Sequence, residues 1–204
     1  SPEELTRWSR RRGQMGIRDG LNLARSRLSL CIVYCRGGKM NEGDTGFRDP
    51  RLDRLYAYWR NKKGERLAPS RSDLLPSEIK PYLPVINLID VRREPLGFRH
   101  RLVGTEIVER LGRDATGCWV SAALYGPAWE EIFEGLRTVM EEGRPYRRLA
   151  RLDWHVRPWL SMESLELPLI GDDGAVNMIL RAASYFTDKE SASRKRCLTW
   201  SLVA

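Results

Sequence analysis

The sequence predicts an α+β domain in which an antiparallel sheet is covered by helices. Three observations carry this prediction. Successive side chains of residues 98–103 would point alternately to the two faces of a half-buried strand. A short helical pattern follows at 105–111. Residues 127–142 form a longer helix with one apolar face, and residues 146–185 divide into three segments of strand length. Strands, then helices, then strands again in one chain are typical of α+β folds.

The first predicted helix begins after Asp49 and ends before Gly64. Asp49 is a favoured N-cap residue, and Pro50 suits the first helical position. Four apolar side chains fall at helical spacing and form one stripe: Leu52, Leu55, Tyr56 and Trp59. A single stripe needs one partner surface, so this helix either folds back on its own sheet or pairs with a second copy. We expect a homodimer through the stripe.

The remaining elements follow in the order two strands, helices, three strands. The strands are predicted at 85–91, 98–103, 146–156, 161–170 and 176–185, and residues 171–174, Gly-Asp-Asp-Gly, read as a hairpin turn. Gly104 and Gly112 each stand where a regular element ends. We expect both to be needed by the backbone, with Gly112 at a positive φ. The predicted fold is a five-stranded antiparallel sheet with helices on one face and an N-terminal helical extension.

Charge divides the chain into three parts: a basic leader (1–47), a nearly neutral domain (48–186) and a basic tail (187–204). Residues 49–186 carry 21 Lys/Arg and 20 Asp/Glu, so the net charge of +8 belongs mainly to the two ends. Basic ends are weak evidence for a nucleic-acid partner. We expect solvated arms, and a nucleic-acid-associated protein is kept as an alternative.

The leader, residues 1–47, shows no persistent helix or strand period, and we expect no packed structure there. Met40 follows an Arg-Gly-Gly-Lys stretch that a ribosome-binding site can encode, so we expect the natural start at Met40. No apolar run has the roughly 20 residues that a membrane span needs. Only Cys118 of the four cysteines lies in the domain, which fits a reducing cytoplasm and argues against a disulfide or a thiolate zinc site.

Several stretches together resemble the PAS superfamily. Phe-Arg-x-Arg-Leu-Val-Gly-Thr from Phe98, followed by Gly-Arg-Asp-x-Thr-Gly from Gly112, is similar to the second strand and first helices of a PAS domain. The resemblance is to a family of small bacterial stand-alone PAS proteins of uncharacterised function. It begins at Leu55-Tyr56-Ala57-Tyr58-Trp59 and reaches Phe186. It implies a sensory or signalling domain that is not an enzyme, with a pocket between a curved sheet and short helices.

The resemblance also bears on cofactors, which the sequence leaves unknown. Flavin-binding photosensor PAS domains carry a reactive cysteine in Gly-x-Asn-Cys-Arg-Phe-Leu-Gln, whereas this chain has Gly117-Cys118-Trp119-Val120. Haem-sensing PAS domains commonly take an axial histidine from the long helix, and residues 127–142 contain none. Flavin and haem are therefore both disfavoured.

No catalytic or metal-binding motif stands out in the chain. Neither His100 nor His155 lies beside a nucleophile in a recognisable pattern, and there is no HExxH, P-loop or GxGxxG. His100 shares a strand face with Phe98 and Leu102. It is therefore either a hydrogen-bonded core histidine or a pocket residue, and a small-molecule enzyme that uses it is a second alternative.

We predict that a PAS-type pocket holds a small apolar or aromatic ligand fixed by a few polar groups. The predicted lining residues are His100, Trp119, Tyr125, Trp129 and Met178. Ligand or partner binding there would shift the sheet and the N-terminal helix. We recognise no kinase, cyclase or DNA-binding module in the sequence, so we expect the output to act in trans on a signalling protein such as a histidine kinase or a cyclic-dinucleotide enzyme.

Overall fold

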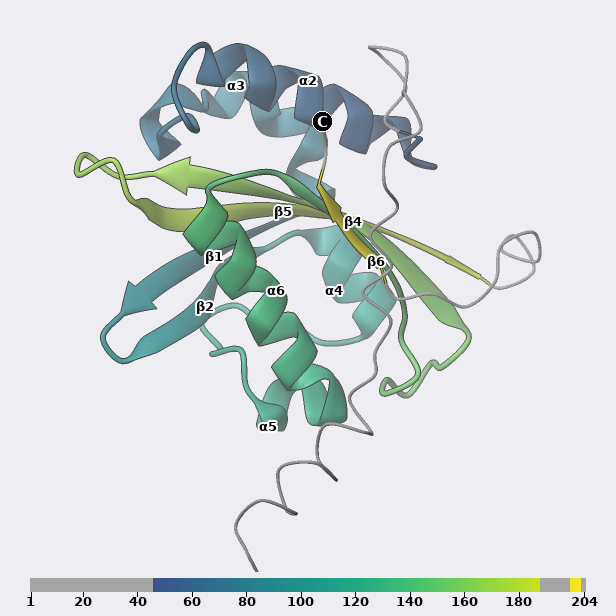
Figure 1. The fold of residues 1–204 in the computed structure, drawn as a ribbon. Helices are drawn as coiled ribbons and strands as arrows, with labels where there is room; N and C mark the ends of the chain where they lie inside the picture. The colour runs from purple at the N-terminus through teal and green to yellow at the C-terminus, as the bar shows by residue number, and fades with distance from the viewer. Residues whose placement is uncertain (1–45, 188–198, 203–204) are drawn as a thin grey trace, which may run out of the picture. The chain divides into compact units, whose positions relative to one another are not determined.

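The computed structural model describes residues 46–187 and 199–202 (Figure 1). The leader up to residue 45, including Met40, lies outside the described residues. The first half of the domain contains α2 (Pro50–Lys63), η1 (Arg71–Asp73), α3 (Pro76–Ile79), η2 (Lys80–Val85), β1 (Ile86–Arg93) and β2 (Leu96–Val103). The second half contains α4 (Thr105–Leu111), α5 (Ala122–Tyr125), η3 (Gly126–Ala128), α6 (Trp129–Glu142), β3 (Tyr146–Arg151), β4 (Leu160–Ile170), β5 (Val176–Thr187) and β6 (Thr199–Leu202).

The strands form one sheet in the order β2-β1-β5-β4-β3-β6, and every neighbouring pair is antiparallel. The predicted five-stranded antiparallel sheet and the α+β class are confirmed in β1–β5. Strand β6 adds a sixth strand beside β3, from the segment that was expected to be only a basic tail. Strand β3 ends at Arg151, before the predicted 156, because the chain turns there and the His155 amide donates to the Leu152 carbonyl.

The backbone needs glycine at both positions that the sequence predicts, for two different reasons. Gly112 ends α4 at a φ of 68° in the left-handed region, where a side chain is disfavoured. Gly104 has an ordinary extended backbone, with a φ of −65°. Its constraint is space, since a Cβ there would lie 2.3 Å from the Pro84 carbonyl oxygen. The close approach lets the Gly104 amide donate to Ile86 O at 2.8 Å.

Helix α2 lies on the opposite face of the sheet from α4, α5 and α6 (Figure 1). The expectation of helices on one face therefore holds for α4–α6, and the N-terminal extension covers the other face. Asp49 caps the helix by accepting from the Arg51 amide at 2.9 Å, as predicted. The apolar stripe packs against residues of β1, β4 and β5, and Trp59 Nε1 donates to Pro168 O at 2.9 Å.

This packing uses the stripe that the sequence suggested for a homodimer, and the homodimer itself stays a prediction. Leu52, Leu55, Tyr56 and Trp59 are only 0%, 1%, 6% and 2% exposed within a single chain. A helix in this place has no free apolar stripe to offer a second copy. The structure therefore has the other arrangement that the pattern allowed, in which the helix folds back on its own sheet.

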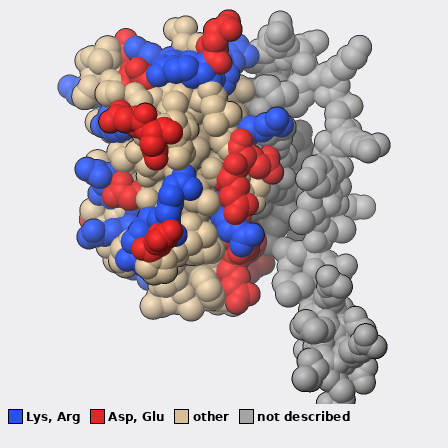
Figure 2. Space-filling view, turned by 60° about the vertical axis from the view of Figure 1, so that its left-hand side comes forward, with Lys and Arg blue, Asp and Glu red and all other residues tan. Residues whose placement is uncertain are grey.

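One ion pair joins α2 to the opposite layer of the molecule. Arg51, in the first turn of α2, binds Asp49 and also reaches Glu106 of α4, with Nη1 2.7 Å from Oε2. Both carboxylates raise the pKa of the Arg51 guanidinium. Charge elsewhere is mixed, and Figure 2 shows Lys/Arg and Asp/Glu side chains interspersed over one face of the described residues.

Candidate functional site

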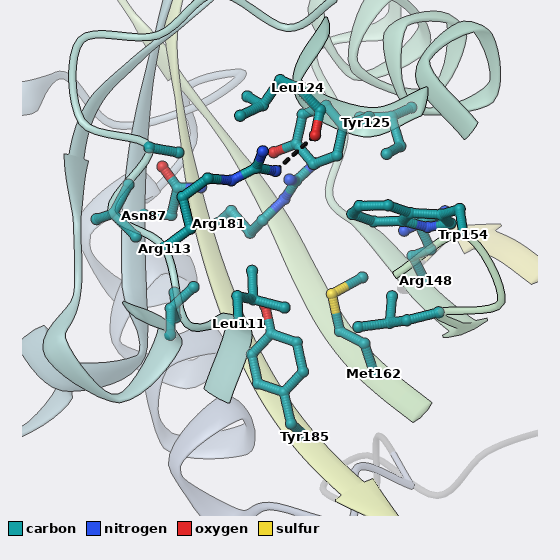
Figure 3. A pocket seen from close by; sticks show the side chains of 15 residues that line it. Asn87, Leu111, Arg113, Leu124, Tyr125, Arg148, Trp154, Met162, Arg181 and Tyr185 are labelled. Carbon is teal, nitrogen blue, oxygen red and sulfur yellow. Dashed lines mark hydrogen bonds between the residues drawn. The ribbon is translucent and has the colours of Figure 1, made fainter. Parts of the chain in front are cut away.

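The candidate site is a cavity on the face of the sheet that α4, α5 and α6 cover (Figure 3). Its volume is about 40 Å³. About 10–15 Å³ of such space is enough for one water molecule, so the cavity suits a small guest. The apolar lining is Val103, Ile107, Leu111, Ala115, Leu124, Ile132, Leu152, Trp154 and Met162. The polar lining is Asn87, Arg113, Tyr125, Arg148, Arg181 and Tyr185.

Strand alternation decides which residues of β5 face this cavity. Arg181 and Tyr185 line it, whereas Met178 belongs to the apolar cluster under α2. Successive side chains on a strand point to opposite faces, and three positions separate Met178 from Arg181. The prediction that Met178 lines the pocket is therefore wrong, because its side chain lies on the other face of the sheet.

His100 lies behind the cavity wall in a buried chain of hydrogen bonds. Its Nδ1 is 3.1 Å from Asn87 Oδ1, its Nε2 is 2.8 Å from the Tyr125 hydroxyl, and its side chain is fully buried. An amide oxygen can only accept, so Nδ1 carries the proton and Nε2 accepts from Tyr125. Burial, followed by the charges of Arg181 and Arg113, lowers the pKa of His100 to about 3.

The chain of hydrogen bonds gives His100 a positioning role. It is neutral and both of its nitrogens are occupied, as in a hydrogen-bonded core histidine. Through its two partners it orients Asn87 and Tyr125, which do line the cavity. Of the five predicted lining residues, the structure thus places Tyr125 on the cavity and His100 directly behind it.

The two predicted tryptophans lie away from the cavity. Trp119 is 38% exposed and stacks under the Arg92 guanidinium, 4.1 Å from the ring centroid. Trp129 packs edge-on against Phe133 in the cluster of α6. Both were predicted from residue type and neighbourhood in the sequence. The register of the segment around Trp119, which bridges to Arg99 on β2, turns its ring outward over Gly97.

A buried ion pair lies at the floor of the cavity. Arg181 Nε is 2.9 and 2.8 Å from the two Glu166 oxygens, and Ser164 Oγ donates to Glu166 at 2.9 Å. Arg181 and Glu166 are 5% and 0% exposed. Within the described residues, Arg181 Nη2 is a buried nitrogen without any hydrogen-bond partner. Buried polar groups are seldom left unpaired, since each one costs about 1–3 kcal/mol.

Two further arginines complete the polar lining. Arg148 is buried and binds Glu131 of α6, with Nη2 2.8 Å from Oε1. Arg113 follows the end of α4 and donates from Nη2 to Leu124 O at 2.5 Å, the dashed line in Figure 3. Three guanidinium groups and no carboxylate therefore line the cavity among the described residues.

Sequence reasoning missed all three arginines, although one signal was present. Arg181 interrupts the apolar strand Val176–Thr187, and Glu166 interrupts the apolar strand Leu160–Ile170. Charged residues inside buried strands are rare unless they pair with each other. Their pairing across β4 and β5 was therefore predictable. The approach of Arg113 and Arg148 to the cavity was not predictable, because it depends on how the loop after α4 and the helix α6 pack against the sheet.

Three further features concern only the described part of the chain. Cys118 there is a free, exposed thiol. The described residues hold no group of three or more His, Cys, Asp or Glu side chains that could bind a metal ion. None of the described helices is long and apolar enough to cross a membrane.

The site has the position that a PAS pocket has, between an antiparallel sheet and its short helices. A family model for the PAS domain matches residues 47–183, more than half of the chain. The chain belongs to the PAS domain family. PAS domains are in general sensory rather than catalytic, which supports a sensory role here and agrees with the neutral, fully bonded His100.

One solved bacterial structure is similar to part of this chain. The crystal structure of a sensory box sensor histidine kinase from Vibrio cholerae is 15% identical, with a TM-score of 0.38. The match covers 57% of this chain and 91% of that one. No curated protein matches this chain.

Proposed function

We propose that this PAS domain senses a small molecule in the cavity of Figure 3 and transmits its binding to helix α2. The observation that carries the proposal is the position of α4. Ile107 and Leu111 of this helix line the cavity, while Glu106 of the same helix binds Arg51 of α2. One short helix thus contacts both the ligand site and the element on the far face of the sheet.

The proposed signal is a shift of α4 that reaches α2. A ligand changes a conformation only through a difference in affinity between two states. A guest that fits the cavity better when Ile107 and Leu111 move would draw Glu106 with them. The ion pair with Arg51 then pulls on the first turn of α2. The output acts in trans on a cytoplasmic signalling protein, and a histidine kinase or a cyclic-dinucleotide enzyme is the partner class we favour.

Binding is tested first, by a thermal-melting screen of small molecules with a pocket-filling control. Ala115 lines the cavity, whereas Ala123 of α5 is exposed and does not. Ligands of the cavity should raise the melting temperature of the parent and of Ala123→Leu, but not of Ala115→Leu. Ligands that protect all three proteins equally bind elsewhere, and a screen with only such hits would overturn the proposed pocket.

Transmission is tested by hydrogen exchange in α2. Ligand binding should change the exchange of amides in Pro50–Lys63 of the parent. In Arg51→Gln the ligand should still bind, while the response of α2 is lost. An unchanged α2 response in this variant would exclude the Arg51 route. The output is tested by adding the purified chain, with and without ligand, to histidine kinases of its host and measuring autophosphorylation.

A further inference from the structure

The charge of the cavity narrows the class of ligand. Arg113, Arg148 and Arg181 all reach the lining, and no acidic side chain of the described residues does. Figure 3 shows the Arg181 and Arg113 side chains on the same side of the cavity as Asn87 and Tyr125, and Arg148 on the other side, toward Trp154 and Met162. The Met162 and Leu111 side chains lie farther along the wall. Two of the three guanidinium groups, those of Arg181 and Arg113, therefore lie on one side of the cavity.

Most of this charge already has a partner, so the excess is small. Arg181 is bound by Glu166 and Arg148 by Glu131, which leaves Arg113, whose hydrogen bond goes to a neutral carbonyl. A guest that matches one excess positive charge is a monoanion. Arg113 is exposed, so water solvates part of its charge, and a dianion such as phosphate would bring more negative charge to the site than this arginine can match.

Arg181 supplies a second, independent observation. Its Nη2 is buried and has no hydrogen-bond partner among the described residues, while its Nε holds Glu166. An unpaired buried N–H is a strong donor that an acceptor would stabilise. The Tyr125 hydroxyl also lines the cavity, and it uses its proton on His100 Nε2, so it has none left to donate to a guest.

We infer that the cavity binds a short-chain monocarboxylate, with its carboxylate at Arg181 and Arg113 and its alkyl tail against Ile107, Leu111 and Met162. A carboxylate has two acceptor oxygens and suits planar guanidinium donors. The small volume, about 40 Å³, excludes long chains. This inference rests on the proposed function, because it names the ligand class of the same pocket.

The test is calorimetric titration of the full chain with sodium salts of acetate, propionate, butyrate and octanoate, at constant ionic strength. Propanol and butyramide are the uncharged controls, and sodium chloride and sodium phosphate are the inorganic ones. The short carboxylates should bind at least about tenfold more tightly than the uncharged analogues, as for a hydrogen bond to a charged group. Octanoate should bind weakly, because the cavity cannot hold it.

Three variants assign the binding to the arginines. Arg113→Gln should weaken carboxylate binding roughly tenfold or more. Arg110→Gln removes the same charge from an exposed residue outside the lining and should leave the affinity within about twofold. Arg181→Lys keeps a cation for Glu166 but loses Nη2, so it should lose carboxylate binding while the far-ultraviolet circular dichroism of the parent is retained.

Each contrary result has a distinct meaning. Equal binding of butyramide and butyrate would overturn the monocarboxylate and leave the sensory pocket standing. Equal or tighter binding of chloride or phosphate would overturn the carboxylate in favour of an inorganic anion. If no carboxylate binds while other ligands pass the Ala115→Leu test, only this inference fails. If nothing passes that test, the proposed function fails as well.

Discussion

The two faces of the sheet are built from different kinds of side chain. Under α2 the core is an apolar cluster that includes Leu55, Trp59 and Leu167. Among the described residues, Glu163 is the carboxylate buried on this face, and it binds both Arg147 and the Arg48 amide. Under α4–α6 the core includes His100, Arg148, Arg181 and Glu166, and the Arg181 Nη2 nitrogen has no hydrogen-bond partner among the described residues. Packing alone explains the first face, whereas the second face retains a buried polar group that the described residues leave without a partner.

The largest predicted effect comes from placing a charge on the apolar face. Leu55→Asp should lower the free energy of unfolding by about 5 kcal/mol or more, because a carboxylate would be buried without a partner. Urea denaturation measures the loss. Ala57→Asp introduces the same group on the exposed side of α2 and should cost less than about 1 kcal/mol. Equal losses in both variants would show that the helix does not pack on its own sheet.

The second prediction concerns the buried charges of the pocket face. Glu166→Gln keeps the shape of the side chain but leaves Arg181 buried without a counter-charge, and it should cost about 3–5 kcal/mol. Glu163→Gln is the matched change on the other face. It should cost only about 1 kcal/mol, since its partner Arg147 is 21% exposed and water can solvate the guanidinium. Urea denaturation of both variants compares the two values directly.

A double replacement checks why Glu166→Gln is expected to lower the free energy of unfolding. Replacing Glu166 by Leu together with Arg181 by Met removes both charges and should return stability to within about 1 kcal/mol of the parent. The double variant should lose the ligand response of the pocket at the same time. If it is as unstable as Glu166→Gln alone, the cost comes from packing and not from the unpaired charge.

The two faces also differ in how far the sequence predicts them. Strand and helix periods are local, so the stripe of α2, the five strands and the helix-ending Gly112 follow from spacing alone. Spacing does not show which surface covers the stripe, because an apolar stripe can be buried equally well by a sheet or by a second chain. The pocket depends on non-local register, and Met178 and Trp119 were misplaced for that reason. The sequence did place Tyr125 and His100 at or next to the pocket, but it did not predict the hydrogen bond between them.

The third prediction uses pH to distinguish the faces. His100 has a pKa lowered to about 3 by burial and by Arg181 and Arg113, whereas in the unfolded chain it titrates at about 6.5. Below pH 6.5 the unfolded state therefore binds a proton that the folded state does not take up. Stability is fully present above that pH and should fall by about 1.4 kcal/mol per pH unit on acidification.

Urea denaturation between pH 6.5 and 5 measures this slope before most carboxylates titrate. His100→Phe removes the titrating group from the same position and should flatten the dependence in that window. The buried cluster under α2 contains no histidine among the described residues, so a Leu55→Ala variant should keep the slope of the parent. A slope that survives in His100→Phe would assign the pH dependence to other groups.

The smallest effects are predicted at the glycines that end the helix on each face. Gly64 closes α2 at φ 56° and ψ −130°, and Gly112 closes α4 at φ 68° and ψ 16°. A Cβ at either position would meet nothing within 4 Å, so only backbone strain is at issue. The Gly112 angles lie in the left-handed helical region, which other residues visit at a cost of about 1 kcal/mol. The Gly64 angles lie outside it and should cost about 2 kcal/mol.

Urea denaturation of Gly64→Ala, Gly112→Ala and the two asparagine variants separates these costs. Asparagine tolerates the left-handed region, so Gly112→Asn should recover part of the loss of Gly112→Ala, whereas Gly64→Asn should recover little. Gly112 also positions Arg113, the next residue, over the cavity. Gly112→Ala should therefore weaken ligand binding as well as stability, while Gly64→Ala should change stability alone. Equal effects of the two alanine variants on binding would show that the end of α4 does not position Arg113.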